Sequence, residues 1–586
     1  MTGQQAAACA ISVRQAAKGN GTMVRKSKAD YRKKPALMAL ALGMVAAATT
    51  AHASDLVLTN GRIYTAAGGQ WAQAIAITGG TIEKVGSNAE VLKTKTATTR
   101  VVDLKGKMVV PGFTDDHTHI WFGSLVLDGF NFSTENEEIT PEKNRAVFIA
   151  RIKAYAKAHP AYAVLIGRAD FGRGTGAKWD LPAADKAILD EASPDRPLVV
   201  HNTSEHALWV NSKALALAGI GDKPLPDPVE EKYVVRDAAG HPTGVLNEAA
   251  QEVMERALPP MPIEEKDRIL RVGLHYMNSF GITSAAILTG GLDDLKAFDA
   301  LRKRGELTVR VRQGFAAVAV NHHLTPAFLA DLETARATWH DDWISANLVK
   351  FFMDGYPTAP LYTPEQYTTI IAELDKRGFS VTSHALTPAG AKMALDGYQA
   401  VEQANGPRDR RFRIEHGDSL YAADLPRFAR LGVVVSTQPA FCCGGADSEA
   451  VEVPGNPWNS LLKSGARLVF SSDWPCSWPP SPLAGIQQAV ERRQYNIDNA
   501  SGSRDGLPND GHPEEAVTAE QALLAYTRTA AWANGTDGKL GTLEAGKLAD
   551  LVVLSRDILA IPADQIGKTN VEATVVGGRV VYGQLP

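Results

Sequence analysis

The feature that most constrains the fold is a series of eight apolar, β-branched runs separated by stretches with helical patterning. Runs of this kind are typical of parallel strands that crossover helices bury on both faces. Eight strand–helix repeats close into a barrel whose chemistry lies at the C-terminal ends of the strands. We therefore predict an α/β fold with a TIM-like (β/α)8 barrel. The runs cover residues 108–119, 281–288, 307–314, 347–355, 379–385, 411–417, 433–439 and 468–474.

The connection between the first and second runs is about 160 residues long. Structureless connections of that length are rare inside compact domains. This segment also carries its own strand-like and helix-like patterns, such as AYAVLIGR at 161–168. We predict an inserted subdomain at about residues 122–265, after the first barrel strand, that covers the active site and shapes substrate choice.

Short alternating strands broken by glycines lie at both ends of the chain. They occupy residues 54–110 and again 540–586, with all longer elements in between. This symmetry predicts one small composite β-sandwich domain built from both termini, beside a barrel at 111–539. Two unrelated edge hairpins are the alternative.

The first 53 residues have the layout of a secretory signal. A basic stretch at 25–34 precedes an apolar run at 35–48, and Ala51-His52-Ala53 provides an A-x-A site. We expect an N-terminal extension with a signal peptide that is cleaved near Ala53 and Ser54, and a periplasmic or secreted mature protein. The apolar run is shorter than the roughly 20 residues that span a bilayer, so we expect no stable membrane span, with a retained anchor as the alternative.

Charge and cysteine content exclude two classes of protein. The formal net charge is −4, without the basic excess that a nucleic-acid partner would require. Four cysteines are too few for a disulfide scaffold. One bridge from Cys476 to either Cys442 or Cys443 would suit an oxidising compartment, and free buried thiols are the alternative.

Residues that can bind a metal lie at the C-terminal ends of five predicted strands. His117 and His119 are two apart, so both imidazoles face the same side of their strand. Imidazoles with a carboxylate suit Zn²⁺ or a similar ion that keeps one position open for water. The metal would lower the pKa of that water to about 7, and Asp473 could accept its proton and pass it to a leaving amine. The predicted ligands are His117, His119, Lys350, His384, His416 and Asp473.

Several motifs occur in a characteristic order. They are PGFTDDHTH at 111–119, HALWVNSKALALAGI at 206–220, GVLNEA at 244–249, VKFFMDG at 349–355, SHA at 383–385, RIEHG at 413–417, SSDWP at 471–475 and GKLGTLEAGKLADLVVLSRD at 538–557. With these motifs the chain resembles the amidohydrolase superfamily, specifically amidohydrolase family 3, which includes N-substituted formamide deformylases. The resemblance extends over essentially the whole mature chain.

The resemblance implies a barrel with a composite β domain and one or two divalent metal ions, usually zinc. In binuclear relatives the lysine of the fourth strand is carbamylated and bridges the metals, and Lys350 holds that position. The alternative is an ordinary lysine that pairs with a carboxylate such as Asp354. Relatives continue the fifth-strand histidine as HAIGD, whereas Thr387 lies three residues after His384 here. Many deaminases place a glutamate there, so this difference argues against deamination.

Residues outside the metal set would contact the substrate. His206 and Glu248 lie in the insertion and are either substrate-binding or structural. Trp474 follows a ligand-bearing strand, and with it Trp121, Phe122, Tyr356 and Trp478 would favour an apolar or aromatic group. The alternative is that these rings pack the barrel mouth.

The sequence thus predicts an exported amidohydrolase that acts on carbon–nitrogen bonds other than peptide bonds. Its substrate would be a small-molecule amide, either N-acyl or N-formyl. A cyclic amidase, a carbamate hydrolase and an ester or lactone hydrolase are alternatives at the same site. A non-catalytic regulatory protein would have lost ligands, whereas the set here is complete. Homo-oligomers are common among relatives, but the sequence carries no interface signal.

Overall fold

The computed structural model describes residues 54–132, 141–169, 185–202, 207–259, 261–317, 324–354, 362–442, 453–493 and 512–586. The predicted signal segment, His206, Tyr356 and Cys443 lie outside the described residues. Residues from His52 to Pro586 form one compact unit. Within the described ranges, no helix has both the length and the apolar character needed to cross a membrane.

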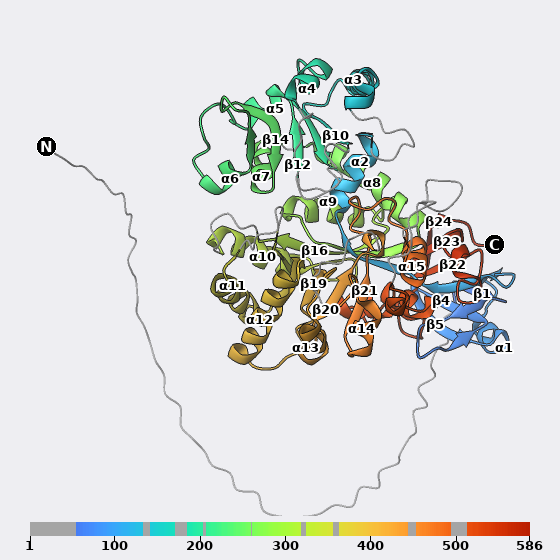
Figure 1. Cartoon of the computed structure of the whole chain (residues 1–586). Helices are drawn as coiled ribbons and strands as arrows, with labels where there is room; N and C mark the ends of the chain where they lie inside the picture. Colours follow the sequence, from blue (N-terminus) through green and yellow to red (C-terminus); the bar gives the residue numbers. More distant parts are fainter. Residues whose placement is uncertain are drawn as a thin grey trace, which may run out of the picture. The chain divides into compact units, whose positions relative to one another are not determined.

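Eight parallel strands form a nearly closed barrel, which confirms the predicted α/β fold (Figure 1). The strands pair with one another in chain order. The barrel closes where Thr118 at the end of β8 forms a parallel bridge with Trp474, just after β21. The barrel strands are β8 (Phe113–Thr118), β15 (Ile282–Ile287), β16 (Arg310–Ala316), β17 (Ile344–Phe352), β18 (Ser380–Ala385), β19 (Arg413–His416), β20 (Val434–Thr437) and β21 (Arg467–Phe470).

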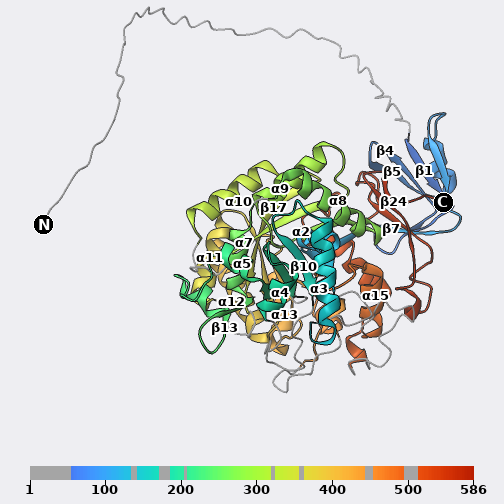
Figure 2. The same cartoon turned by 90° about the horizontal axis from the view of Figure 1, so that it is seen from above.

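Helices connect successive barrel strands and pack against their outer face (Figure 2). Four of them begin in the same way, with a serine or threonine N-cap followed by proline: Thr325–Pro326, Thr363–Pro364, Thr387–Pro388 and Ser481–Pro482. This pair satisfies free backbone donors and presets the first helical turn. The helices after β15 are α9 (Leu292–Lys303), α10 (Pro326–Thr338), α11 (Pro364–Lys376), α12 (Pro388–Asn405), α13 (Leu425–Leu431), α14 (Trp458–Lys463), α15 (Pro482–Glu491), α16 (Ala519–Ala525) and α17 (Arg528–Ala533).

The first predicted run, 108–119, is two strands rather than one. Its first half is β7 (Met108–Pro111), which pairs with β2 and β22 of the β domain. Gly112 separates this strand from β8. A Cβ atom at Gly112 would lie 2.1 Å from Oγ1 of Thr283, so only glycine allows the chain to pass β15 here.

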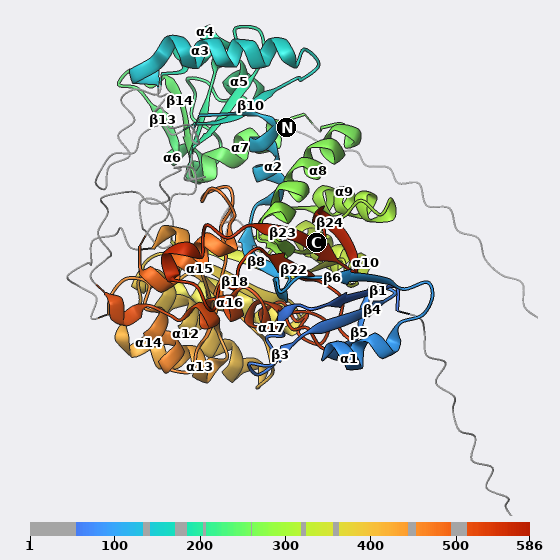
Figure 3. The same ribbon diagram turned by 90° about the vertical axis from the view of Figure 1, so that its right-hand side faces the viewer.

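Strands from both ends of the chain form two stacked sheets beside the barrel (Figure 3). One sheet has the order β5-β4-β1-β6 and the other β24-β23-β22-β7-β2-β3. Both sheets contribute to one apolar core, with Leu58 and Ile75 from the first and Val109 and Val553 from the second. The strands are β1 (Leu56–Thr59), β2 (Arg62–Tyr64), β3 (Trp71–Ala72), β4 (Ala74–Thr78), β5 (Thr81–Gly86), β6 (Arg100–Asp103), β22 (Leu551–Leu554), β23 (Val571–Val576) and β24 (Arg579–Gly583).

The insertion after β8 has a sheet and a core of its own. Its strands follow the order β13-β14-β12-β11-β10-β9. Neighbouring residues of β11 alternate between two apolar clusters, so both faces of this sheet are buried. The elements are α2 (Ile120–Asp128), β9 (Phe130–Asn131), α3 (Pro141–Ala158), β10 (Leu165–Ala169), α4 (Lys186–Ala192), β11 (Leu198–Asn202), β12 (Ala207–Val210), α5 (Ser212–Leu217), α6 (Pro228–Lys232), β13 (Val234–Arg236), β14 (Pro242–Asn247) and α7 (Ala249–Ala257). Helix α2 packs on α8 (Ile263–Ser279), which leads back into the barrel.

Candidate metal centre

The six predicted ligands lie at the C-terminal end of the barrel. His117 is in β8 with His119 just after it, Lys350 is in β17, His384 in β18 and His416 at the end of β19, and Asp473 follows β21. The imidazole rings form a chain in which neighbouring centroids are 4.5 to 5.6 Å apart, in the order His119, His117, His416, His384. All six are buried except His119, which is half-buried.

His117, His119 and Asp473 form a cluster that could bind a metal ion. Oδ1 of Asp473 lies 3.2 Å from Nε2 of His117 and 3.1 Å from Nε2 of His119. Backbone hydrogen bonds hold this arrangement, because the Asp473 N–H donates to the His117 carbonyl and the His119 N–H donates to the Trp474 carbonyl. Asp473 has a φ of 56°, a strained value for a residue with a side chain. Such strain is typical of functional sites.

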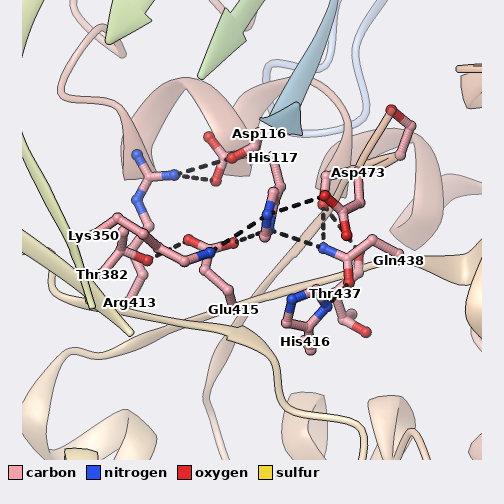
Figure 4. Close-up of polar contacts among 12 residues, drawn as sticks. Asp116, His117, Lys350, Thr382, Arg413, Glu415, His416, Thr437, Gln438 and Asp473 are labelled. Atoms are coloured by element: carbon pink, nitrogen blue, oxygen red, sulfur yellow. Dashed lines mark hydrogen bonds and ion pairs between the residues drawn. The ribbon is translucent and has the colours of Figure 1, made fainter. Parts of the chain in front are cut away.

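A neighbouring side chain occupies the Nδ1 atom of three histidines, which leaves Nε2 for a metal. Figure 4 shows one of these contacts, between His117 and Glu415. The partners are Glu415 for His117 at 2.9 Å, Thr289 for His119 at 2.7 Å and Gln438 for His416 at 2.7 Å. Hydrogen bonds of this kind fix the tautomer and the ring orientation of metal-binding histidines. Sequence reasoning missed all three partners. The sequence offers one indication for Glu415, because it is the only acidic residue within the sixth predicted strand and it precedes His416 directly.

Lys350 is buried beside His117. Its Nζ lies 3.5 Å from Nε2 of His117 and 5.2 Å from the centre of the Phe352 ring. Within the described part of the chain, no carboxylate lies within ion-pair distance of Nζ, so the alternative pairing with Asp354 is absent. Burial lowers the pKa of Lys350, which favours the neutral amine.

Asp354 contacts the loop after β18 instead of Lys350. It accepts hydrogen bonds from the backbone N–H groups of Leu386 and Thr387 and from the Thr387 hydroxyl, at 2.6 to 3.0 Å. Its Oδ1 is also 3.5 Å from Nε2 of His384. Thr387 additionally caps α12, where it accepts from the N–H of Gly390. A carboxylate is therefore present near His384 although the loop itself lacks the acidic residue of relatives.

The electrostatics of the site favour neutral imidazoles beside ionised carboxylates. Burial lowers the pKa of His117, and burial is also the main cause that lowers the pKa of His416 to about 3. Burial acts to raise the pKa of Asp473, but its contacts with His117, His119 and His416, including a hydrogen bond with His119, outweigh burial and hold this pKa below its usual range. Neutral histidines and an ionised aspartate are the forms that bind a divalent cation.

The predicted substrate residues have different environments. Trp474 is completely buried, and its ring lies against Gly123 and Tyr276. This side chain therefore packs the barrel mouth, which was the alternative to a substrate contact. Glu248 begins α7 at the end of β14 with a φ of 39°. The ring of Phe122 lies 4.1 Å from that of His201 in the insertion.

The predicted bridge to Cys476 is wrong. Cys476 retains its thiol. Cys442 is disulfide-bonded, so the alternative of free thiols does not describe it either.

Comparison with known proteins gives consistent matches over most of the chain. The model of the amidohydrolase family matches residues 100–582. Protein LONG AFTER FAR-RED 3 of Arabidopsis thaliana is 31% identical, over 90% of this chain and 92% of that protein. The N-substituted formamide deformylase of Arthrobacter pascens is 27% identical, over 90% of this chain and 98% of its own length. A metal-dependent hydrolase of Pyrococcus horikoshii shares the fold, with a TM-score of 0.67 and 22% identity over 87% of this chain and 99% of that one.

Proposed function

This chain belongs to the amidohydrolase family of metal-dependent hydrolases, and we propose that it cleaves an amide bond of a small molecule to release an amine. The observation that carries the proposal is the position of Asp473, whose Oδ1 faces Nε2 of both His117 and His119. The substrate class that we propose is an N-acyl or N-formyl compound. A relative named N-substituted formamide deformylase supports formamides as the first members to test.

The donor set fits a zinc ion or a similar divalent metal. We assign His117, His119, His384, His416 and Asp473 as its ligands, because three of the histidines have Nδ1 occupied and the site holds an ionised carboxylate. The bound metal supplies a water molecule of lowered pKa and polarises the substrate carbonyl.

Asp473 transfers the proton in this proposal. Water adds to the carbonyl carbon, and the Asp473 carboxylate accepts the proton that the water loses. The carbon–nitrogen bond then breaks, and Asp473 returns the proton to the leaving nitrogen, which gives a carboxylic acid and an amine. The Asp473 carboxylate suits this role because its oxygen lies among the imidazoles that would hold the metal.

If the site holds two metal ions, we propose that Lys350 would help to hold them as a carbamate. Its buried Nζ lies 3.5 Å from Nε2 of His117. A carbamate on this nitrogen would therefore be close to the cluster of His117, His119 and Asp473. A neutral amine adds to the carbon of CO2 and loses one proton, which converts the side chain into an anionic oxygen ligand. Burial favours that neutral amine.

A substrate panel tests the proposed reaction. The zinc-loaded enzyme is incubated with N-formyl and N-acyl amines, cyclic amides, carbamates, esters and lactones, and the released amine and acid are quantified together. We expect equal amounts of amine and acid from the N-formyl or N-acyl compounds. If the enzyme turns over only cyclic amides, only carbamates or only esters, that class is the substrate and the proposed N-acyl or N-formyl class is wrong. No turnover of any compound by metal-loaded enzyme would contradict the proposal and favour a regulatory role.

A further inference from the structure

Glu415 is a buried carboxylate next to the candidate centre that belongs to no ligand set. It lies in β19 immediately before His416 and is completely inaccessible to solvent. Its Oε2 is 2.9 Å from Nδ1 of His117, and its other oxygen accepts a hydrogen bond from the Thr382 hydroxyl (Figure 4). Residues of two other barrel strands, β8 and β18, thus hold both carboxylate oxygens.

The environment of Glu415 supplies a hydrogen-bond partner to each carboxylate oxygen despite its burial. The guanidinium of Arg413 donates to Asp116 at 2.6 Å and forms its ion pair there, not with Glu415. The hydrogen bonds of Glu415 therefore go to His117 and Thr382.

The contact with Glu415 decides which nitrogen of His117 carries the proton. One oxygen of Glu415 accepts from the Thr382 hydroxyl, and the other accepts from Nδ1 of His117, so Nε2 of His117 presents its lone pair. The amide nitrogen of Gln438 lies 3.3 Å from the same Nδ1. Both groups carry hydrogens and act as donors, so no hydrogen bond forms between them. That amide nitrogen donates to Ser471 Oγ at 2.9 Å, a geometry that leaves Nδ1 to Glu415.

We propose that Glu415 is a positioning residue that holds His117 in the tautomer and orientation in which Nε2 binds the metal. This inference rests on the proposed function, because it assumes that His117 is a metal ligand. Glu415 itself touches neither metal nor substrate. Its effect is to raise the affinity of the site for metal.

The Glu415→Gln variant tests this role. The side-chain amide has nearly the same shape but lacks the charge, and it can turn its NH2 group towards Nδ1, which disfavours the required tautomer. Loss of such outer hydrogen bonds typically weakens metal binding about 10–100-fold. We expect a zinc dissociation constant higher by about that factor, measured by competition with a chromophoric chelator. Turnover should recover when zinc is saturating.

Two further variants make the test specific. Thr382→Val removes only the hydroxyl that anchors Glu415, so we expect weaker zinc binding by about 2–10-fold, less than for the Gln variant. Ser383→Ala is the matched control on the same strand. Ser383 is completely buried and its hydroxyl contacts Tyr367 and Tyr398 rather than Glu415, so this variant should lose thermal stability but keep wild-type zinc affinity.

The outcomes separate this role from the proposed function. A folded Glu415→Gln protein whose zinc affinity is within about two-fold of the wild type would overturn the positioning role alone. If that variant does not fold, wild-type affinity in Thr382→Val overturns the role instead. A wild-type protein that binds no zinc would refute the metal centre, and this inference would fall with it.

Discussion

Replacing Asp473 by asparagine tests the proposed proton transfer. The substitution keeps the size of the side chain and one oxygen that can face Nε2 of His117 and His119, now 3.2 and 3.1 Å from Oδ1. It removes the negative charge and the group that accepts the proton. The apoprotein should fold but lose some stability, because the buried carboxylate has its pKa held below the usual range by the imidazoles around it.

The expected loss follows from the role of the group. General acid–base catalysis contributes about 10²–10⁴ in rate, or roughly 3–5 kcal/mol of transition-state free energy. Metal affinity should also fall, because an anionic ligand is replaced by a neutral one. The turnover number must therefore be measured at saturating zinc, so that loss of metal is not mistaken for loss of the proton acceptor.

A control at the other end of the barrel completes this experiment. Asp550 is as buried as Asp473 and pairs with Arg310 at the start of β16, far along the strands from the metal site. Asp550→Asn should lower thermal stability but leave the turnover number of folded enzyme unchanged. If Asp473→Asn at saturating zinc keeps a turnover number within about ten-fold of the wild type, the proton-transfer role is refuted.

Three other predictions concern Lys350, Gly112 and Glu252. Lys350→Ala should lower the metal content, and short carboxylic acids should partly restore turnover; unchanged metal content without rescue would identify a structural lysine. Gly112→Ala places a methyl group 2.1 Å from Thr283 Oγ1, which should cost about 1–3 kcal/mol in denaturant unfolding, and an unchanged midpoint would contradict this packing argument. Burial raises the pKa of Glu252 to about 7, so its contribution to stability is present below pH 4.5 and is lost as the pH rises through 7. Glu252→Gln should therefore be more stable than the wild type by about 1–3 kcal/mol at pH 8 and equal to it at pH 4; a pH-independent difference would refute the shift.

The barrel could be predicted from sequence because each strand has a local signal. Apolar β-branched runs, separated by helices that begin with Thr-Pro or Ser-Pro, fix both the strands and the points where they end. Ligands such as His117 and His416 follow from these strand ends. The division of the first run at Gly112 has a further cause, the side chain of Thr283, which is about 170 residues away in sequence.

The residues that orient the ligands could not be predicted for a similar reason. Thr289, Gln438 and Glu415 are single polar residues whose role depends on a histidine from another strand. No spacing within one element identifies such pairs. Thr387 is a second example. Its contribution to the site is the hydrogen bond that it donates to Asp354, which follows the preceding barrel strand, and its own motif does not reveal this contact.

The metal content of the purified protein tests the central claim most directly. Wild-type enzyme, reconstituted with zinc and then desalted, is compared with His117→Ala by elemental analysis. We predict about one or two ions per chain in the wild type and near-complete loss in the variant. Two ions would support Lys350 as the bridging ligand, and one would remove that role. A wild type without metal, or a variant that retains the same content, would contradict the assignment of this site.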